Sequence, residues 1–148
     1  MKSKIMPPSY FLISLALTIG INFILPIKKI IPFPYTYVGA LFILFGIIIN
    51  IWTDNLFKKS KTTVKPYETP ISFEVSGPFS ISRHPMYLGM CAILTGVAII
   101  LGSISTFVFP IIFIILMEIM FIPFEERNLE QEFGEKYLDY KKKVRRWF

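Results

Sequence analysis

A short polar segment holds the residue types best suited to chemistry in this chain. It runs from Gly77 to Gly89 and contains the only histidine, His84, between Arg83 and Pro85. Proline fits the first turn of a helix, because its missing N–H donor would be unpaired there in any case. The free amides of such a helix start, with an arginine beside them, suit a carboxylate or a phosphate. The structural alternative is a helix cap and an arginine bound to lipid phosphates.

A second charged cluster, Glu125 and Glu126, directly follows an apolar run. We expect it at the end of a helix, where negative charge is mildly unfavourable, and one of the two acids is a candidate for binding a cation or sugar hydroxyls. Alternatively, both are solvated acids paired with Arg127 or Lys65. Glu118 lies seven residues before Glu125 and shares its helix face. An acid inside a membrane span is costly, so Glu118 is a functional candidate unless the surface wets it.

Both clusters lie at the mouths of long uncharged segments. The chain has 148 residues, and 53% of them are hydrophobic, too many for an ordinary soluble domain. A membrane-crossing helix needs about 20 apolar residues, and irregular backbone cannot face lipid. We therefore predict an all-α integral membrane protein with one domain, residues 1–148. It has four transmembrane helices, near 9–27, 35–52, 87–101 and 107–124, the last two forming a hairpin around a turn at 102–106.

The positions of the basic residues predict the orientation. Of the 16 lysines and arginines, all except Lys28 and Lys29 lie in the N-terminal segment, the loop 53–86 or the C-terminal tail 125–148. Four spans place these three segments on one side, which the positive-inside rule makes cytoplasmic. The membrane is then the plasma membrane of a prokaryote or the endoplasmic reticulum of a eukaryote. The net charge of +6 indicates contact with anionic lipid head groups rather than nucleic acid.

The loop and the tail are expected to cover the site. Prolines at 66, 70 and 78 fix extended turns in the loop, and loops of this length are commonly functional. In the tail, apolar residues recur every three or four positions, which predicts an amphipathic cytoplasmic helix with a bend at Gly134. This helix lies along the membrane interface or folds back over the loop.

Several kinds of site are disfavoured. The single cysteine, Cys91, excludes an intrachain disulfide, and one cysteine with one histidine argues against a zinc site. We therefore expect no metal. The paired carboxylates of glycosidases, a nucleophile elbow, a phosphate-binding loop of the Walker type and a dinucleotide fingerprint are not found in the sequence.

The two polar blocks resemble a superfamily of integral-membrane enzymes, the isoprenylcysteine carboxyl methyltransferases and phospholipid N-methyltransferases. The first block is Gly77-Pro78-Phe79 followed by Ser82-Arg83-His84-Pro85-Met86-Tyr87-Leu88-Gly89. The second is Glu125-Glu126 followed by Leu129, Phe133-Gly134, Tyr137 and Tyr140. With the hydrophobic hairpin between them, the resemblance covers about half of the chain, residues 77–140.

This resemblance implies S-adenosylmethionine as the methyl donor, in a cytoplasmic pocket roofed by the loop and the tail. It implies a lipophilic acceptor (prenylcysteine, a phospholipid or a small lipophilic molecule) that enters sideways between the helices. Arg83 and Glu118 are the candidate catalytic residues. The loop over residues 66–86 is then the cofactor-binding loop, and residues 71–74 line the cofactor pocket. The implied cofactor contacts are Phe79, His84, Pro85, Met86, Tyr87, Glu125 and Glu126.

One position departs from the resemblance. Members that methylate prenylated cysteine have an arginine one turn before the acid pair, which meets the substrate carboxylate, and here that residue is Phe121. An isoprenylcysteine carboxyl methyltransferase-like enzyme is the main expectation, although Glu118 favours a cationic or amine acceptor. The alternatives are a phospholipid amine N-methyltransferase, an NADPH-dependent membrane reductase related to sterol reductases, and a non-catalytic membrane scaffold.

Overall fold

The computed structural model describes residues 6–60 and 73–148, which are helical and contain no β-strand. Three helical stretches are long and apolar enough to cross a membrane: α1 (Pro7–Ile24), α2 (Tyr37–Lys59) and a continuous run over Ile104–Phe133. The remaining apolar helix, α3 (Pro85–Leu101), is shorter. The all-helical class is confirmed, and α3 stays a predicted fourth crossing.

The long C-terminal helical run extends beyond the predicted span 107–124. It begins with the 3-10 turn η2 (Ile104–Phe107), continues as α4 (Val108–Leu116) and the π-helical segment η3 (Met117–Phe121), and ends as α5 (Ile122–Phe133). The helix therefore does not stop at Phe124. Pro123 lies in the first turn of α5, directly after a π segment that already departs from the regular hydrogen-bond pattern, so it does not end the helix.

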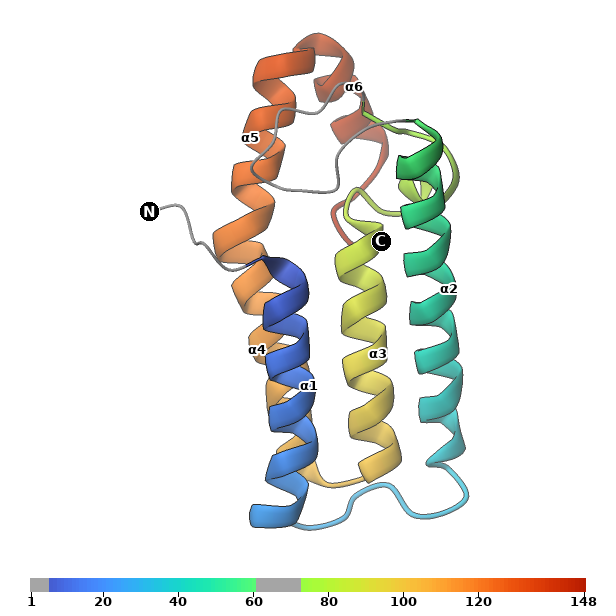
Figure 1. Cartoon of the computed structure of the whole chain (residues 1–148), viewed down its shortest axis with the longest axis vertical. Helices are drawn as coiled ribbons and strands as arrows, with labels where there is room; N and C mark the ends of the chain where they lie inside the picture. Colours follow the sequence, from blue (N-terminus) through green and yellow to red (C-terminus); the bar gives the residue numbers. More distant parts are fainter. Residues whose placement is uncertain (1–5, 61–72) are drawn as a thin grey trace.

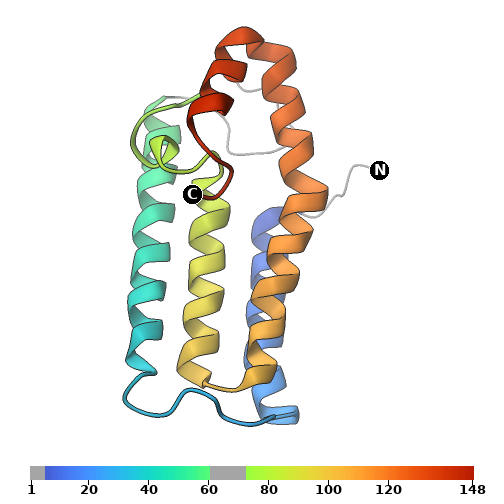
Figure 2. The same ribbon diagram turned by 180° about the vertical axis from the view of Figure 1, so that it is seen from behind.

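Helix α3 occupies the middle of the bundle, with α2 on one side and α1 and α4 on the other (Figures 1 and 2). Glycines let α2 and α3 approach closely. A Cβ atom on Gly46 would clash with the carbonyl oxygen of Gly89, and one on Gly39 would clash with that of Gly96. Backbone contact between these two helices therefore fixes the position of the start of α3.

Large apolar side chains cover the outside of the bundle. Leu12 on α1, Leu41 on α2 and Ile111 on α4 are 60%, 66% and 56% exposed. The main buried cluster lies where α3 meets the long C-terminal run, and it consists of Tyr87, Met90, Leu94, Phe113, Met117, Phe121 and Ile122. An apolar exterior of this extent suits lipid rather than water.

The two ends of the bundle differ. At one end, the α1–α2 connection is tied to the turn after α3, where the Ile30 amide donates to the Gly102 carbonyl over 2.8 Å. At the other end, α5 extends past the remaining helices, and α6 (Glu135–Lys143) turns back after Gly134 (Figure 1). The 3-10 turn η1 (Gly77–Ser80) and the C-terminus lie at this second end. The two polar blocks of the sequence meet there.

Candidate functional site

Glu126 is the centre of a buried charged cluster. Its side chain is only 4% exposed and accepts hydrogen bonds from Nε and Nη2 of Arg146 over 3.1 and 3.0 Å. The Nη1 atom of Arg83 lies 3.0 Å away, and that side chain is 8% exposed. Lys141 approaches to 3.6 Å. A buried carboxylate needs such compensation, because removing one charge from water is costly unless it is paired.

Glu125 lies beside this centre and contacts the start of α3. The Tyr87 hydroxyl donates to its Oε1 atom, and its Oε2 atom lies 3.2 Å from Nδ1 of His84. The rings of His84 and Tyr87 stack with 5.7 Å between their centroids. Because His84 precedes α3 and Tyr87 lies in its first turn, one helix start directs both groups towards one acid of α5.

The surroundings of His84 favour its charged form. Burial by itself lowers the pKa of this histidine. Glu125 and Glu126, on either side of the ring, together raise the pKa by more than burial lowers it, so the net shift is upward from 6.5. Its Nε2 atom lies 3.5 Å from Oε1 of Glu126, so each ring nitrogen faces a carboxylate. An opposite charge at this distance is the usual reason for such a shift.

Some buried donors of the cluster have unused hydrogen-bonding capacity. Within residues 6–60 and 73–148, the Nε and Nη1 atoms of Arg83 make no aligned hydrogen bond. The Nη1 atom nevertheless lies within ion-pair distance of Oε1 of Glu126. Buried polar groups are nearly always hydrogen-bonded in native proteins. The Nη1 atom is paired in charge with Glu126, so the Nε–H group is the donor of Arg83 that is left for an anionic ligand such as a carboxylate.

The C-terminal segment closes over the cluster. The Arg83 amide donates to the Arg145 carbonyl over 3.0 Å, and the Ser82 hydroxyl donates to the Arg146 carbonyl over 2.7 Å. Trp147 packs against the main buried cluster. Of the two predicted positions for the tail, it therefore folds back, against the polar segment that precedes α3.

Glu118 faces Arg146 rather than Glu125. The Nη1 atom of Arg146 donates to Oε1 of Glu118, and Nε1 of Trp147 donates to Oε2 over 3.1 Å. The expected alignment with Glu125 assumed a regular α-helix. The π segment Met117–Phe121 adds about one residue to the turn, so Glu118 is aligned with the acid eight positions later, and the same guanidinium bonds Glu118 and Glu126.

The expected neighbours of the acid pair are also corrected. Glu125 and Glu126 do not end a helix but lie in the first part of α5, so the argument from a helix C-terminus does not apply. Their charged neighbours are Arg83, His84, Lys141 and Arg146. Lys65, one of the expected partners, lies outside the described residues.

The other predicted cofactor contacts lie in different surroundings. Pro85 is buried at the first turn of α3, as expected. Met86 lines a cavity towards α1 and α2. Phe79 belongs to an aromatic cluster with Tyr137 and Tyr140, and its carbonyl accepts from the Tyr140 hydroxyl over 2.6 Å. Phe79 therefore joins η1 to α6.

The loop residues expected to line the cofactor pocket are only partly described. Residues 71 and 72 lie outside the described part of the chain. Phe73 packs on Phe133 with 4.8 Å between the ring centroids, and Glu74 accepts a hydrogen bond from the Ser60 hydroxyl. The described end of the loop is thus held against α5 and the end of α2.

Arg146 and Lys141 are the members of the cluster that sequence reasoning missed. From the sequence, the basic residues of the tail predict the topology and contact with lipid head groups, but not a pairing with the acids. The two polar blocks pair Glu125 and Glu126 with one arginine from the first block, Arg83, which leaves negative charge uncompensated. The basic residues of the tail could have been predicted to supply the missing positive charge.

Comparison with known proteins assigns the chain to a family. Residues 34–136 match the family described as "Phospholipid methyltransferase". The chain belongs to this family. An uncharacterized protein of Haemophilus influenzae is 42% identical over 62 residues, which cover 42% of this chain and 98% of that protein. No solved structure matches. Membership in the phospholipid methyltransferase family and the apolar helices identify an integral membrane protein, and they confirm the superfamily that the two polar blocks indicated.

Proposed function

We propose that this protein transfers a methyl group from S-adenosylmethionine to a lipophilic acceptor at the cytoplasmic surface of a membrane. The observation that carries the proposal is the buried cluster of Arg83, His84, Glu125 and Glu126, at the place where α3 and α5 meet. Perturbed and buried ionisable groups of this kind concentrate at functional sites. Membership in the phospholipid methyltransferase family supports the reaction class.

The residues present fit S-adenosylmethionine. This molecule has a carboxylate, an amino group, ribose hydroxyls and a positive sulfur. The Nε–H group of Arg83, which has no hydrogen-bond partner within the described residues, suits the carboxylate. The carboxylate of Glu125 suits the amino group or a hydroxyl.

The donor supplies an electrophilic methyl group, and the protein supplies position and protection. An in-line displacement gains most of its acceleration from alignment of the reacting atoms and from exclusion of water. The Tyr87 hydroxyl orients Glu125. Trp147 packs against the main buried cluster of apolar side chains. These groups hold the acids in place without taking part in bond making.

The topology belongs to the same proposal. Helix α3 is the fourth crossing, so both termini and the charged cluster lie on the cytoplasmic side. The excess of lysine and arginine on that side supports this orientation.

The acceptor is better matched by an amine than by a carboxylate. Phe121 replaces the arginine that would meet a prenylcysteine carboxylate. Its side chain is 1% exposed and packs edge-on against Tyr10 with 5.5 Å between the ring centroids. Arg146 does not substitute for that arginine, because Glu118 and Glu126 already accept its hydrogen bonds. These contacts favour the phospholipid amine alternative over the isoprenylcysteine carboxyl methyltransferase-like expectation.

The test is calorimetric titration of the detergent-purified protein with S-adenosylhomocysteine. We expect saturable binding that is lost in Glu125→Gln and kept in Glu132→Gln, which removes an exposed acid of the same helix. NADPH is the second ligand, since a reductase would bind it instead. Folded protein that binds NADPH, or neither ligand, would contradict the proposal and favour the reductase or the scaffold.

A further inference from the structure

The last four residues of the chain form a strap beside the charged cluster. Residues 145–148 follow α6 without helix or strand. The Arg145 carbonyl accepts a hydrogen bond from the Arg83 amide over 3.0 Å, and the Arg146 carbonyl accepts one from the Ser82 hydroxyl over 2.7 Å. The strap therefore lies against the segment before α3, where Figure 2 shows the C-terminus.

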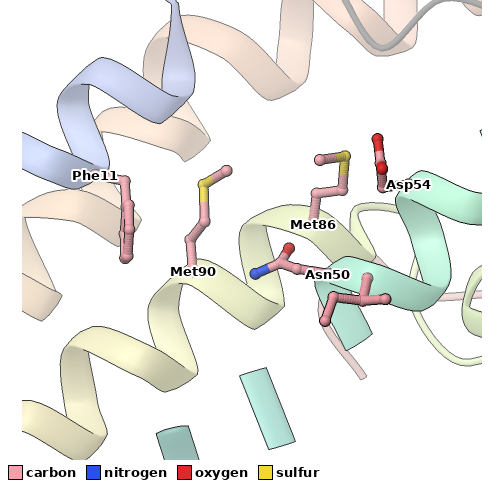
Figure 3. Close-up of a pocket in the computed structure, with 6 residues that line it drawn as sticks. Phe11, Asn50, Asp54, Met86 and Met90 are labelled. Carbon is pink, nitrogen blue, oxygen red and sulfur yellow. The ribbon is translucent and has the colours of Figure 1, made fainter. Parts of the chain in front are cut away.

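The groups of the charged cluster are hidden from solvent. The side chains of Glu126, His84 and Arg83 are only 4%, 5% and 8% exposed, so a ligand that bonds to them needs an entrance. The cavity of about 340 Å³ between α1, α2 and α3 does not supply it, because none of the cluster residues lines that cavity (Figure 3). Its lining consists of Phe11, Asn50, Ile51, Asp54, Met86 and Met90. The strap, by contrast, bonds to both Glu126 and Arg83, so its departure uncovers them.

Glu118 ties the free end of the strap to the long C-terminal helical run. Its Oε1 atom accepts a hydrogen bond from Nη1 of Arg146, and its Oε2 atom accepts one from Nε1 of Trp147 over 3.1 Å. An acid inside an apolar run is costly and needs a partner. Both of these partners belong to the strap, so the strap accounts for the position of this acid.

The contacts with Glu118 can break at low cost. The side chains of Arg146 and Glu118 are 35% and 36% exposed, and ion pairs that are open to water are weak. Trp147 is only partly buried against the main buried cluster. Val144 joins the strap to α6 in an extended conformation, with φ −120° and ψ 130°, and residues at the end of an element are common hinges. The strap can therefore move while α6 stays in place.

Glu126 remains compensated when the strap leaves. Arg146 is one of its positive neighbours, but Arg83 and Lys141 lie 3.0 and 3.6 Å from its carboxylate oxygens, and His84 lies at 3.5 Å. None of these three residues belongs to the strap. Opening therefore does not leave a buried carboxylate without a partner, which is the change that costs most in a buried ion pair.

We propose that Glu118 is the latch of this strap, which opens to admit a ligand to the charged cluster and closes over it. Opening breaks both bonds to Glu118 and takes the Arg145 carbonyl away from the Arg83 amide. Glu118 is then a positioning residue, because it acts through Arg146 and Trp147. Admission of S-adenosylmethionine rests on the proposed function, whereas movement of the strap does not.

The test is hydrogen exchange of single amides, measured by mass spectrometry of the full chain in detergent. The Arg83 amide is bonded to the strap, so its exchange reports opening. The Leu88 amide donates to the His84 carbonyl over 3.1 Å at the start of α3, so its exchange reports unfolding of that helix. We expect Glu118→Gln to speed exchange of the Arg83 amide about tenfold, the loss of one charge-assisted hydrogen bond. Exchange of the Leu88 amide should stay unchanged.

Two further variants check the assignment. Trp147→Phe removes the second bond to Glu118 and should also speed exchange of the Arg83 amide, and this variant decides the question if Glu118→Gln does not fold. Glu132→Gln changes an exposed acid of the same helical run and should have no effect. Unchanged exchange in both latch variants, or equal acceleration at Arg83 and Leu88 in both, overturns the latch.

S-adenosylhomocysteine separates this proposal from the proposed function. A bound ligand holds the strap closed, so a concentration about ten times its Kd should slow exchange of the wild-type Arg83 amide about tenfold. Glu118→Gln should speed both association and dissociation of the ligand. Binding that leaves exchange at Arg83 unchanged, or rates that Glu118→Gln leaves unchanged, overturns the strap as an entrance. If the wild-type protein binds no S-adenosylhomocysteine but exchange at Arg83 still depends on Glu118, the latch stands and the methyltransferase proposal fails.

Discussion

Glu126 shows at the scale of one residue how the site is held together. Four cationic or ionisable side chains surround this carboxylate: Arg83, His84, Lys141 and Arg146. They come from the segment before α3, from α6 and from the tail that follows it. A single buried acid thus connects three parts of the chain, and its charge adds to the backbone hydrogen bonds that join the first to the last of them.

Glu126→Gln should therefore destabilise the protein strongly. Its removal leaves Arg83 buried without its counter-charge, which costs about 3–5 kcal/mol for a buried ion pair. Thermal unfolding of the detergent-purified protein measures the loss. Asp139→Asn is the control, because its pair with Lys142 is exposed on both sides and is worth at most about 1 kcal/mol. Equal effects of the two substitutions would contradict the central role of Glu126.

His84 should make the stability depend on pH. Its pKa is raised in the folded protein, so its contribution is complete below the ordinary value of 6.5 and is lost as the pH rises through the raised value. As the pH rises above 6.5, we expect the Tm of the wild-type protein to fall more steeply than that of His84→Gln. Parallel Tm profiles would show that the acids do not hold His84 in its charged form.

At the scale of elements, the glycine contact between α2 and α3 positions the proposed site. It fixes the start of α3, from which His84 and Tyr87 reach Glu125, and it sets Asn50 against Gly89. The π segment Met117–Phe121 likewise positions polar side chains of the long C-terminal run, because it brings Glu118 and Glu126 to the same arginine. Both features are departures from ordinary helix packing that serve the placement of polar side chains.

Gly46→Ala tests the helix contact. The added methyl group clashes with the Gly89 carbonyl, and overpacking of this kind costs about 1–3 kcal/mol. Gly20→Ala is the matched control, since nothing lies within 4 Å of the added atom and alanine favours a helix by up to about 1 kcal/mol. Thermal unfolding of both variants should show a lower Tm for the first alone. A Tm for Gly46→Ala as high as that of the control would mean that α2 and α3 are not in backbone contact.

At the scale of the whole molecule, the end of the chain completes the site. The segment after Val144 supplies backbone acceptors to Ser82 and Arg83, the guanidinium of Arg146 to two acids, and Trp147 to the main buried cluster. The site is therefore assembled only when the last residues fold back onto the residues just before α3.

Truncation after Val144 should weaken the fold and ligand binding together. Arg146 is 35% exposed, so loss of its pairing with Glu126 costs about 1–2 kcal/mol rather than the full value for a buried pair. We expect a lower Tm and at least about a tenfold loss of affinity for S-adenosylhomocysteine. Removal of Phe148 alone, which is 70% exposed, should change the stability by less than about 0.5 kcal/mol. A truncated protein with unchanged Tm and affinity would place the tail outside the site.

The sequence by itself determined the helical membrane class and the two blocks that form the site. The lengths of the uncharged runs are set by the thickness of a bilayer, and the order His84-Pro85 marks a helix start by local chemistry. Such properties depend on neighbours along the chain, so they can be deduced without a structure.

Only the tertiary structure decided which charges meet and which polar group is left without a partner. Arg146 is bonded to Glu126, which is 20 positions away in the sequence, and to Ser82, which is 64 positions away. From the sequence alone, several other basic residues of the tail were equally good candidates to pair with Glu126. The partner of Glu118 depended on a single π turn, and the orphaned oxygen of Asn50 depended on the approach of α2 to Gly89. These outcomes follow from the path of the chain in space, because buried charges and amides pair with whatever the packing brings near them.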